Sequence, residues 1–379
     1  MRVLCFTASY PPVLGGLQTV AAAVARGLMR RGHRIEVVTN RYPRSLPPRE
    51  TLSGVPVRRF LFLRPDFTFL GRGRPDLFLA SLYYYPVVLR RLTALAKGFR
   101  PDVVNVHYPL GQIPFVLRLR RCFDFRLVVS LHGDELLEPM RRGIDDPRLR
   151  AILREADAVT ACSRWLLGKA EGWEPAVRGK GVVIPNGINP ERFEDKTPYR
   201  HSRPYLLAFG RLSHQKGFDL LLKAFARVAP EKPGLDLILA GDGEERERLT
   251  ALADGLGIKG RIVFFGRAAP EEVVRLLNGC EFVIIPSRWE PFGIVALEAL
   301  AAGKPVLATR VGGLAELAAE SGGTMRLVAP GEEGLYRGLL EMSERRGREG
   351  AAGDFLDTAR TRFSWENMIG GYERILAEG

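Results

Sequence analysis

The sequence predicts an α/β fold with two domains, each built on a parallel sheet with helices on both faces. The chain has 379 residues, more than one hydrophobic core commonly supports. Short β-branched runs alternate with helical patterns along the chain, and a polar, proline-containing segment at 195–204 interrupts this alternation. Strands alternating with helices predict right-handed βαβ units. Two such blocks therefore predict two Rossmann-like domains.

The elements follow in a regular order. The predicted strands of the first block are MRVLCFTASY, RIEVVTN, PDVVNVH, RLVVSLH, DAVTACS and GVVIPNG, with helices between them that include 17–32 and 83–98. The second block has strands YLLAFGRL, LDLILAG, RIVFFG, FVIIPS and PVLATRV, and helices that begin near Gly217, Glu244, Glu271, Phe292 and Gly313. We expect domains at 1–195 and 196–364, with a C-terminal helix at 365–379 that crosses back to the first domain. Ligands of such sheets bind beyond the carboxyl ends of the strands, which predicts a site in an interdomain cleft.

Composition points to a cytoplasmic protein. No signal-peptide pattern follows Met1, and the longest nearly uncharged apolar stretch, 77–89, is shorter than the ~18–20 residues of a membrane-spanning helix. The cysteines have neither metal-ligand nor redox spacing, which predicts buried thiols in a reducing compartment: Cys5, Cys122, Cys162 and Cys280.

Positive charge is concentrated in the first domain. Residues 1–100 contain 17 Lys and Arg against 4 Asp and Glu, a net charge of +13 that equals the net charge of the whole chain. Basic residues alternate with aromatic and aliphatic ones at 58–75, 89–100 and 117–126. This pattern favours an anionic membrane surface, so we expect the protein in the cytoplasm or peripherally on the inner face of the cell membrane. Solvated basic faces, or a basic lining around an anionic acceptor, explain the same residues. No nucleic-acid-binding module accompanies the charge.

The segment SRWEPFGIVALEALAAGKPV carries two glutamates, Glu290 and Glu298, across the start of a predicted helix. A buried strand at 280–287 leads into a short loop, and the helix begins at Phe292. The free N–H groups of its first turn and the helix dipole favour a phosphate there, and the amides concerned are those of Phe292, Gly293, Ile294 and Val295.

Each of the two glutamates is placed to contact a group bound beside this helix start. Glu298 shares a helix face with Ile294, where its carboxylate can accept hydrogen bonds from vicinal hydroxyls. Pro291 holds Glu290 in the loop, from which it projects toward a bound group. The segment thus predicts a socket for a sugar attached through a diphosphate to a nucleoside. The alternative is that both glutamates are solvated charges beside a core helix.

Two cations follow the first strand of the second domain. Arg211 ends YLLAFGRL, and Lys216 lies five residues later, directly before a helix. Arginine offers a planar fork to phosphate oxygens and lysine a compact charge, so the pair can neutralise a leaving diphosphate. Ordinary surface charge is the alternative. No Asp-x-Asp triplet is present, and we expect neither a metal site nor another cofactor.

The first domain offers a glycine pair and a histidine. Gly15 and Gly16 stand between its first strand and first helix, where they allow close backbone approach to a ligand or form a tight turn. His132 ends the strand RLVVSLH and can hydrogen-bond sugar hydroxyls, although a single histidine is more often structural.

These motifs resemble those of the retaining glycosyltransferases of family 4, the glycosyl transferases group 1. The similarity is densest from Gly210 to Leu317, which contains an E-x7-E pair, the run ALAAGKPVLATRVGGLAEL and a G-R-x-x-x-x-K-G segment. It implies the GT-B fold, in which two Rossmann-like domains face one another across a cleft. The first domain then serves the acceptor and the second binds the nucleotide sugar.

The resemblance also implies roles for the site residues. Glu290 contacts the donor sugar, the amides of 292–295 contact sugar and diphosphate, and Glu298 holds the ribose. Arg211 and Lys216 stabilise the leaving diphosphate. His132 contacts the transferred sugar, and Gly15 and Gly16 lie near the donor phosphate and the acceptor. Arg267 lies beside the nucleobase, and His107 matches a recurrent position with a structural or an acceptor-wall role.

The resemblance implies a retaining hexosyl transfer from a UDP- or GDP-sugar, without a metal. The basic first domain leads us to expect an envelope glycan or a lipid-linked acceptor. Asp134 and Glu135 follow the sugar-facing backbone, but neither is clearly placed as a nucleophile, so we favour a same-face substitution over a covalent intermediate. Two alternatives remain: a nucleotide-sugar epimerase on the same fold, and a basic membrane- or polyanion-binding protein with a vestigial sugar site.

Overall fold

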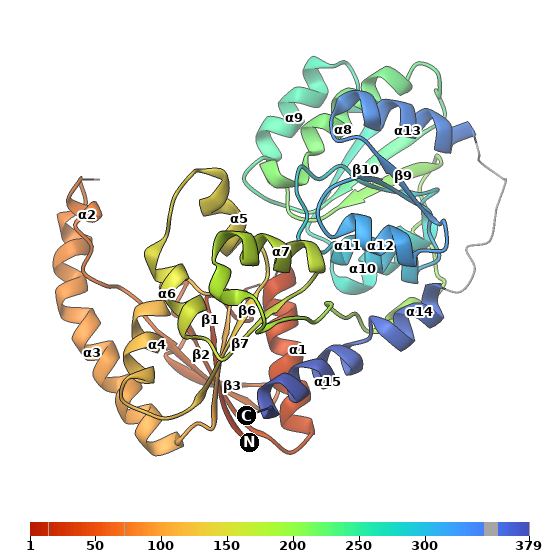
Figure 1. Cartoon of the computed structure of the whole chain (residues 1–379). Coiled ribbons are helices and arrows are strands. Elements are labelled where there is room, and N and C mark those ends of the chain that lie inside the picture. Colours follow the sequence, from red (N-terminus) through yellow and green to blue (C-terminus); the bar gives the residue numbers. More distant parts are fainter. Residues whose placement is uncertain (14, 72, 345–354, 379) are drawn as a thin grey trace. The chain divides into compact units, whose positions relative to one another are not determined.

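The computed structural model describes residues 1–13, 15–71, 73–344 and 355–378. The chain divides into two compact units (Figure 1), the first formed by Met1–Pro185 with Trp365–Gly379 and the second by Asn186–Ser364. Both contain a sheet of mostly parallel strands flanked by helices, which confirms the predicted fold class of two Rossmann-like domains. The first unit ends at Pro185, so residues 186–195, which the sequence assigned to the first domain, lie in the second unit.

Unit 1 contains an eight-stranded sheet in the order β3-β4-β2-β1-β5-β6-β7-β8. Its strands are β1 (Arg2–Thr7), β2 (Arg34–Asn40), β3 (Arg49–Leu52), β4 (Val55–Phe60), β5 (Val103–His107), β6 (Arg126–Leu131), β7 (Ala158–Ala161) and β8 (Gly181–Val183). Its helices are α1 (Gly16–Arg30), α2 (Thr68–Gly71), α3 (Pro75–Phe99), α4 (Ile113–Arg120), α5 (Asp134–Arg141), α6 (Pro147–Glu155), α7 (Arg164–Trp173) and α15 (Trp365–Ala377). The strand order reverses at β1, which pairs with β2 on one side and β5 on the other.

Unit 2 contains a six-stranded parallel sheet in the order β11-β10-β9-β12-β13-β14. Its strands are β9 (Tyr205–Phe209), β10 (Asp236–Ala240), β11 (Ile262–Gly266), β12 (Val283–Ile285), β13 (Val306–Thr309) and β14 (Met325–Val328). Its helices are α8 (Phe218–Val228), α9 (Arg246–Gly255), α10 (Pro270–Gly279), α11 (Ile294–Ala301), α12 (Leu314–Glu320), α13 (Glu332–Glu344) and α14 (Phe355–Arg362). The strands of this sheet are mostly apolar, as expected where helices cover both faces.

The hairpin of β3 and β4 is absent from the predicted strands. Its strands are antiparallel, and the turn residues Ser53 and Gly54 both have positive φ, at 49° and 83°. Such a two-residue turn matches the twist of a hairpin. The segment 49–52 is short and largely exposed, so it lacks the apolar run by which the other strands are recognised. Helix α3 is also longer than expected, because it begins at Pro75 and continues through Pro86.

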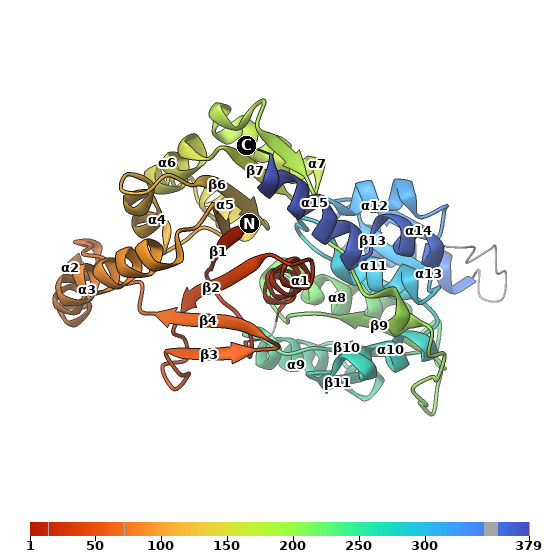
Figure 2. The same cartoon turned by 90° about the horizontal axis from the view of Figure 1, so that it is seen from below.

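The C-terminal helix α15 belongs to unit 1 and packs against α1 (Figure 2). Arg31, the residue after α1, pairs with Glu373 at 2.5 Å and also with Glu366. His33 contacts the same Glu373 at 2.6 Å. Ile369 of α15 lies against Gly27, where an added Cβ would be 2.2 Å from Ile369 Cδ1. The contact between α1 and α15 therefore requires a residue without a side chain at position 27.

Replacing Gly27 by Leu should lower the free energy of unfolding of unit 1 by about 1–3 kcal/mol, because the side chain would force α15 away from α1. Denaturant unfolding measures the change. Gly168→Leu is the matched control: Gly168 lies inside helix α7 with nothing within 4 Å of an added Cβ, so this change should not destabilise. Equal losses in the two variants would contradict the packing argument.

Candidate active site

The loops after β9 and β12 form the candidate site of unit 2. β9 is flanked by β10 and β12, so the strand order of this sheet reverses between β9 and β12. At such a reversal the loops leave the sheet in opposite directions and open a crevice at the carboxyl ends of the strands. Arg211 and Lys216 lie in the loop after β9, and Glu290 lies in the loop after β12. The fold thus brings together residues that are distant in sequence.

Arg288 joins the two loops. Its guanidinium donates from Nη1 and Nη2 to the two carboxylate oxygens of Asp219, each at 2.7 Å, and Nη1 also donates to the carbonyl of His214 at 2.8 Å. Its backbone N–H donates to the carbonyl of Gln215 at 2.8 Å. Burial alone would raise the pKa of Asp219, but the Arg288 guanidinium holds it below its usual value. Neither residue was recognised in the sequence, because an arginine and an aspartate so far apart give no local signal.

Glycine allows the two loops to approach closely. Gly217 has a left-handed φ of 66°, and an added Cβ would lie 2.1 Å from the carbonyl oxygen of Pro286. On the other side of the β12 loop, a Cβ on Gly312 would lie 2.0 Å from the carbonyl oxygen of Glu290. The backbone N–H of Gly313 donates to that same oxygen at 2.9 Å. The backbone of Glu290 is therefore fixed from both sides.

Lys216 and Glu290 form an ion pair at this point. Lys216 Nζ donates to Glu290 Oε2 at 2.5 Å, and the hydroxyl of Ser287 donates to the same oxygen at 3.3 Å. Glu290 is 7% exposed, so its charge is largely removed from water and requires this partner. The pair places a cation suited to phosphate next to a carboxylate suited to sugar hydroxyls.

Helix α11 presents its amino end beside this pair. The helix begins at Ile294, with Gly293 as N-cap at a φ of 105°, so Phe292 precedes the helix instead of opening it as expected. No side chain caps the first turn and the turn contains no acidic residue, which leaves its N–H groups available to an anion. Phe292 is buried and its ring lies 6.3 Å from that of Phe363.

Glu298 lies one turn into α11. Burial raises its pKa to about 7, and the charge of Arg192 opposes this shift. Part of the side chain nevertheless stays accessible. At neutral pH the carboxyl is therefore present in both its protonated and its ionised form.

The other two predicted cations of unit 2 are exposed. Within the part of the chain that the structure describes, Arg211 and Arg267 form no ion pair. Arg211 lies two residues after β9, at the carboxyl end of a strand that borders the switch point. Arg267 follows β11, the outermost strand, and so lies at the same edge of the sheet but away from the β9 and β12 loops.

In unit 1 a pair of histidines occupies the equivalent edge of the sheet. His107 ends β5 and His132 follows the neighbouring strand β6. Nδ1 of His107 and Nε2 of His132 are 3.0 Å apart, and the rings are stacked with centroids 5.3 Å apart. Burial lowers the pKa of His132 to about 4 and that of His107 well below its usual value. Both rings are therefore neutral at pH 7.

The hydrogen bond assigns the protons of the pair. Nε2 of His107 is buried and has no partner among the described residues. A buried N–H without an acceptor is rarer than an unpaired acceptor, so we assign the proton of His107 to Nδ1, which donates to Nε2 of His132. His132 then carries its own proton on Nδ1 and can donate that N–H to a ligand.

Tyr372 and Glu135 support the histidines. The ring of Tyr372, on α15, lies 5.4 Å from that of His107. The carboxylate of Glu135 accepts hydrogen bonds from the backbone N–H groups of His132 and Gly133, the latter at 2.9 Å. Burial raises the pKa of Glu135 to about 8. Glu135 is 2% exposed and is engaged by its own loop, so it does not provide a nucleophile for a bound sugar.

The glycine pair of unit 1 precedes α1. Gly15 is the N-cap with an extended φ of 161°, and Gly16 is the first helical residue. The backbone of Gly15 is thus extended, a conformation that any residue can adopt. The buried Arg59 of β4 donates to the carbonyl of Pro11 at 2.7 Å and pairs with Glu50, which holds the loop after β1 in place.

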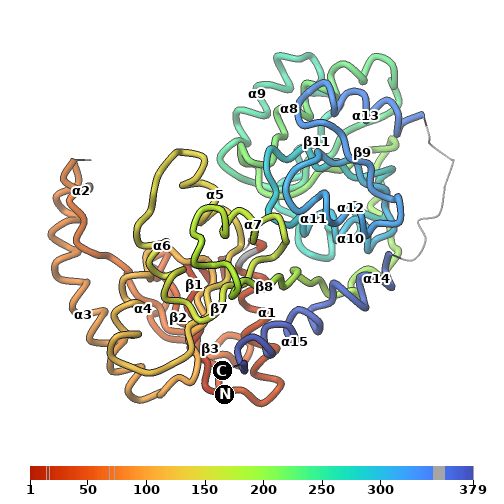
Figure 3. Tube along the Cα trace, viewed as in Figure 1, coloured from red at the N-terminus to blue at the C-terminus, as the bar shows by residue number. Residues whose placement is uncertain are grey.

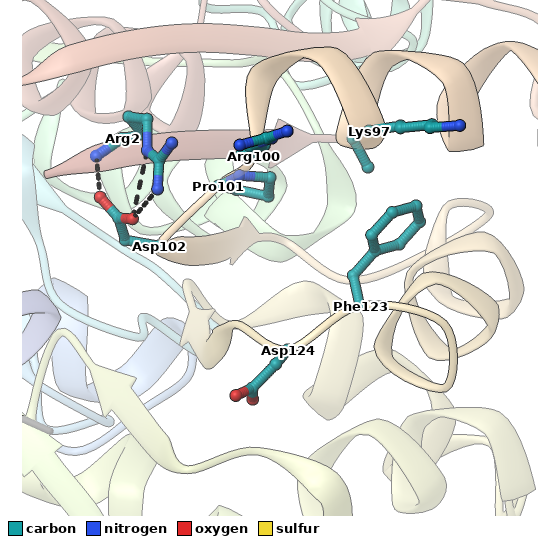
Figure 4. Close-up of a pocket in the computed structure, with 8 residues that line it drawn as sticks. Arg2, Lys97, Arg100, Pro101, Asp102, Phe123 and Asp124 are labelled. Atoms are coloured by element: carbon teal, nitrogen blue, oxygen red, sulfur yellow. Dashed lines mark hydrogen bonds and ion pairs between the residues drawn. The ribbon is translucent and has the colours of Figure 1, made fainter.

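A pocket of about 320 Å³ lies elsewhere in unit 1 (Figure 4). Its lining comes from Arg2, the first residue of β1, and from the segments that precede β5 and β6, with Arg2 paired to Asp102 at 2.5 Å. The pocket is therefore at the amino end of the sheet, opposite His107 and His132, and contains none of the predicted site residues. Among the described residues no cluster of three or more His, Cys, Asp or Glu side chains could hold a metal ion.

Comparison with known proteins decides the family. The family described as Glycosyl transferases group 1 matches residues 189–349, and that described as Glycosyltransferase Family 4 matches residues 14–192. An uncharacterised glycosyltransferase of Methanocaldococcus jannaschii is 31% identical over 336 residues, which are 84% of this chain and 82% of that protein. The chain belongs to the group 1 glycosyltransferases. It is a glycosyltransferase of GT-B fold, as its sequence motifs implied.

Solved structures share the fold of this glycosyltransferase. Sucrose-phosphate synthase from Thermosynechococcus elongatus superposes with a TM-score of 0.81 at 20% identity and covers 99% of this chain and 98% of its own. Anabaena HepE, whose structure contains UDP and glucose, superposes with a TM-score of 0.73 at 22% identity, and both chains are covered completely.

The close approach of the loops after β9 and β12 gives a direct test. Gly217→Ala and Gly257→Ala place alanine at nearly the same left-handed φ, 66° and 69°, but only position 217 has an atom within 4 Å of the new Cβ. Both should lose about 1–2 kcal/mol from the backbone conformation. Gly217→Ala should lose about 1–3 kcal/mol more, because the carbonyl of Pro286 must move. Thermal and denaturant unfolding measure this difference, and equal losses would show that the loops are not in contact.

Proposed function

We propose that this glycosyltransferase is a retaining enzyme that transfers a hexose-type sugar from a nucleoside-diphosphate sugar to an envelope glycan or lipid-linked acceptor. The observation that carries the proposal is the ion pair of Lys216 and Glu290 beside the uncapped amino end of α11. A diphosphate sugar needs positive charge at one end and hydroxyl acceptors at the other, and these groups provide both.

Each residue of the donor site has a distinct part. Lys216 and the N–H groups of Gly293, Ile294 and Val295 bind the diphosphate, and the exposed Arg211 adds a second positive charge. When the bond between the anomeric carbon and the diphosphate oxygen breaks, negative charge grows on that oxygen, and these donors stabilise it without a metal ion. The bound diphosphate competes with Glu290 for Lys216, which frees the carboxylate to accept from the sugar.

The remaining assignments follow the same chemistry. Glu298 accepts hydrogen bonds from the ribose hydroxyls, and Arg267 lies toward the nucleobase. We assign His132 to the transferred sugar, to which its Nδ1–H can donate. A same-face substitution assisted by the leaving phosphate is favoured, since Glu135 is engaged by backbone amides. The UDP and glucose in the similar Anabaena protein make UDP-glucose the first donor to test.

Lys216→Met should weaken UDP-glucose binding about 10- to 100-fold, because a charge-assisted contact with the diphosphate is lost. Titration calorimetry measures this, and a screen for nucleoside diphosphate released from several nucleotide sugars identifies the donor. Lys223→Met, an exposed lysine on the neighbouring helix α8, is the matched control and should bind normally. Unchanged binding of the identified donor by Lys216→Met would contradict the assignment of this site. Turnover that is abolished by EDTA and restored by Mg²⁺ would contradict a metal-free mechanism.

The affinity for the nucleotide sugar should increase as the pH rises through 7. The carboxyl of Glu298 has a pKa of about 7 in the free protein, and two ribose hydroxyls favour the ionised form. Affinity for a UDP-sugar should therefore rise up to about tenfold from pH 6 to pH 8, and Glu298→Gln should remove this dependence. The same raised pKa should make the ligand-free unit less stable as the pH rises from about 4.5 to 7, since the unfolded carboxyl loses its proton first. A pH dependence that survives Glu298→Gln would assign it to another group.

A further inference from the structure

Exposed apolar side chains are concentrated at one end of unit 1. Of the nine large apolar side chains that are exposed among the described residues, five lie between 67 and 83. Single exposed residues are ordinary on a protein surface, whereas a contiguous group marks a contact site. We call this group the α2–α3 tip, and its members are Phe67, Leu70, Leu79, Leu82 and Tyr83.

The tip has little of the protein core beneath it. Most buried residues of α3 lie in its second half, from Val88 to Phe99, where the helix packs on α4. The first half contacts α2, with the rings of Phe67 and Phe78 5.2 Å apart. Figures 1 and 3 show α2 at the far end of α3, beyond the strands of unit 1. The apolar side chains of the tip are therefore not needed to fill the core.

Positive charge continues along the same face of α3. Leu79, Tyr83, Pro86 and Arg90 follow one another at spacings of four, three and four residues, which places them on one side of a helix. Lys97 lies two further turns along the same side. All five are exposed. One helix face is thus apolar toward its free end and cationic toward its attached end.

These cations are available to a partner. Arg58 and Arg59 of β4 are paired with Glu36 and Glu50 within the unit. By contrast, Arg90, Arg91 and Lys97 form no ion pair in the described ranges of the chain. The first 100 residues also carry the entire net charge of +13. The surface next to the tip therefore attracts anions.

We propose that the α2–α3 tip docks on an anionic lipid bilayer. Phe67, Leu79 and Tyr83 enter the headgroup and upper acyl region, and Arg90, Arg91 and Lys97 lie against acidic headgroups. A second copy of the chain fits this surface less well, because a symmetric contact would bring two cationic faces together. The inference deepens the proposed lipid-linked or envelope acceptor, since docking places unit 1 at the surface where such an acceptor lies.

Vesicle sedimentation with the full chain tests this without any donor or acceptor. The protein should bind vesicles with about a third phosphatidylglycerol at least tenfold more strongly than pure phosphatidylcholine vesicles, and added salt should weaken this binding. Leu79→Asp with Tyr83→Asp should reduce binding to anionic vesicles about tenfold or more, and so should Arg90→Glu with Arg91→Glu.

Matched controls separate the tip from general effects. Ile144→Asp changes an exposed apolar residue of the same unit, and Arg178→Glu changes an exposed arginine of unit 1, so both should bind vesicles like the unaltered protein. UDP-glucose binding in the tip variants reports on the proposed function separately. Equal binding to neutral and anionic vesicles, or tip variants that bind normally, would overturn the proposal. A dimer seen by light scattering and lost in the Leu79 and Tyr83 variant would assign the tip to a second copy instead.

Discussion

The candidate site of unit 2 depends on one guanidinium, that of Arg288. It anchors the loop after β12 to Asp219 at the start of α8 and to the backbone at His214 and Gln215. Lys216 and Glu290 each lie within two residues of these contacts of Arg288. The contacts therefore fix the position of the ion pair between Lys216 and Glu290. Removing one member of such a buried pair typically costs about 3–5 kcal/mol, because the other charge is left without a partner. The same contacts hold the loops after β9 and β12 so close together that position 217 requires a glycine.

At the carboxyl ends of its strands, unit 1 has a pair of neutral histidines, whereas unit 2 has an ion pair. The rings of His107 and His132 are buried, and we assign the proton of the hydrogen bond between them to His107. The side chain of Glu135 accepts hydrogen bonds from the backbone N–H groups of the turn after β6. A neutral histidine with a fixed N–H is a directional hydrogen-bond donor without a charge that would attract an anion. The chain closes this arrangement with its own C-terminal helix, because Tyr372 packs against His107. The C-terminal segment is thus part of the support of the histidine pair.

The two units also differ in how much of each contains the family motifs. The sucrose-phosphate synthase of Thermosynechococcus elongatus shares this fold at 20% identity, and a shared fold does not by itself fix the substrate. In unit 1 the β3–β4 hairpin and the exposed, cationic α3 lie outside the motifs that indicated the family. The loops after β9 and β12 of unit 2 contain those motifs.

The sequence by itself determined the fold class and most of the strands and helices, because buried parallel strands and amphipathic helices leave local patterns. It also nominated Arg211, Lys216, Glu290 and Glu298 as candidate site residues, because they stand in extended motifs. Only the tertiary structure decided the start of α11 at Ile294, the hairpin at 49–60 and the partners of Arg288, His107 and Tyr372. These depend on contacts between residues far apart in the chain, for which spacing along the sequence contains no information. The exposure of the α2–α3 tip is of the same kind, since burial is a property of the packed unit.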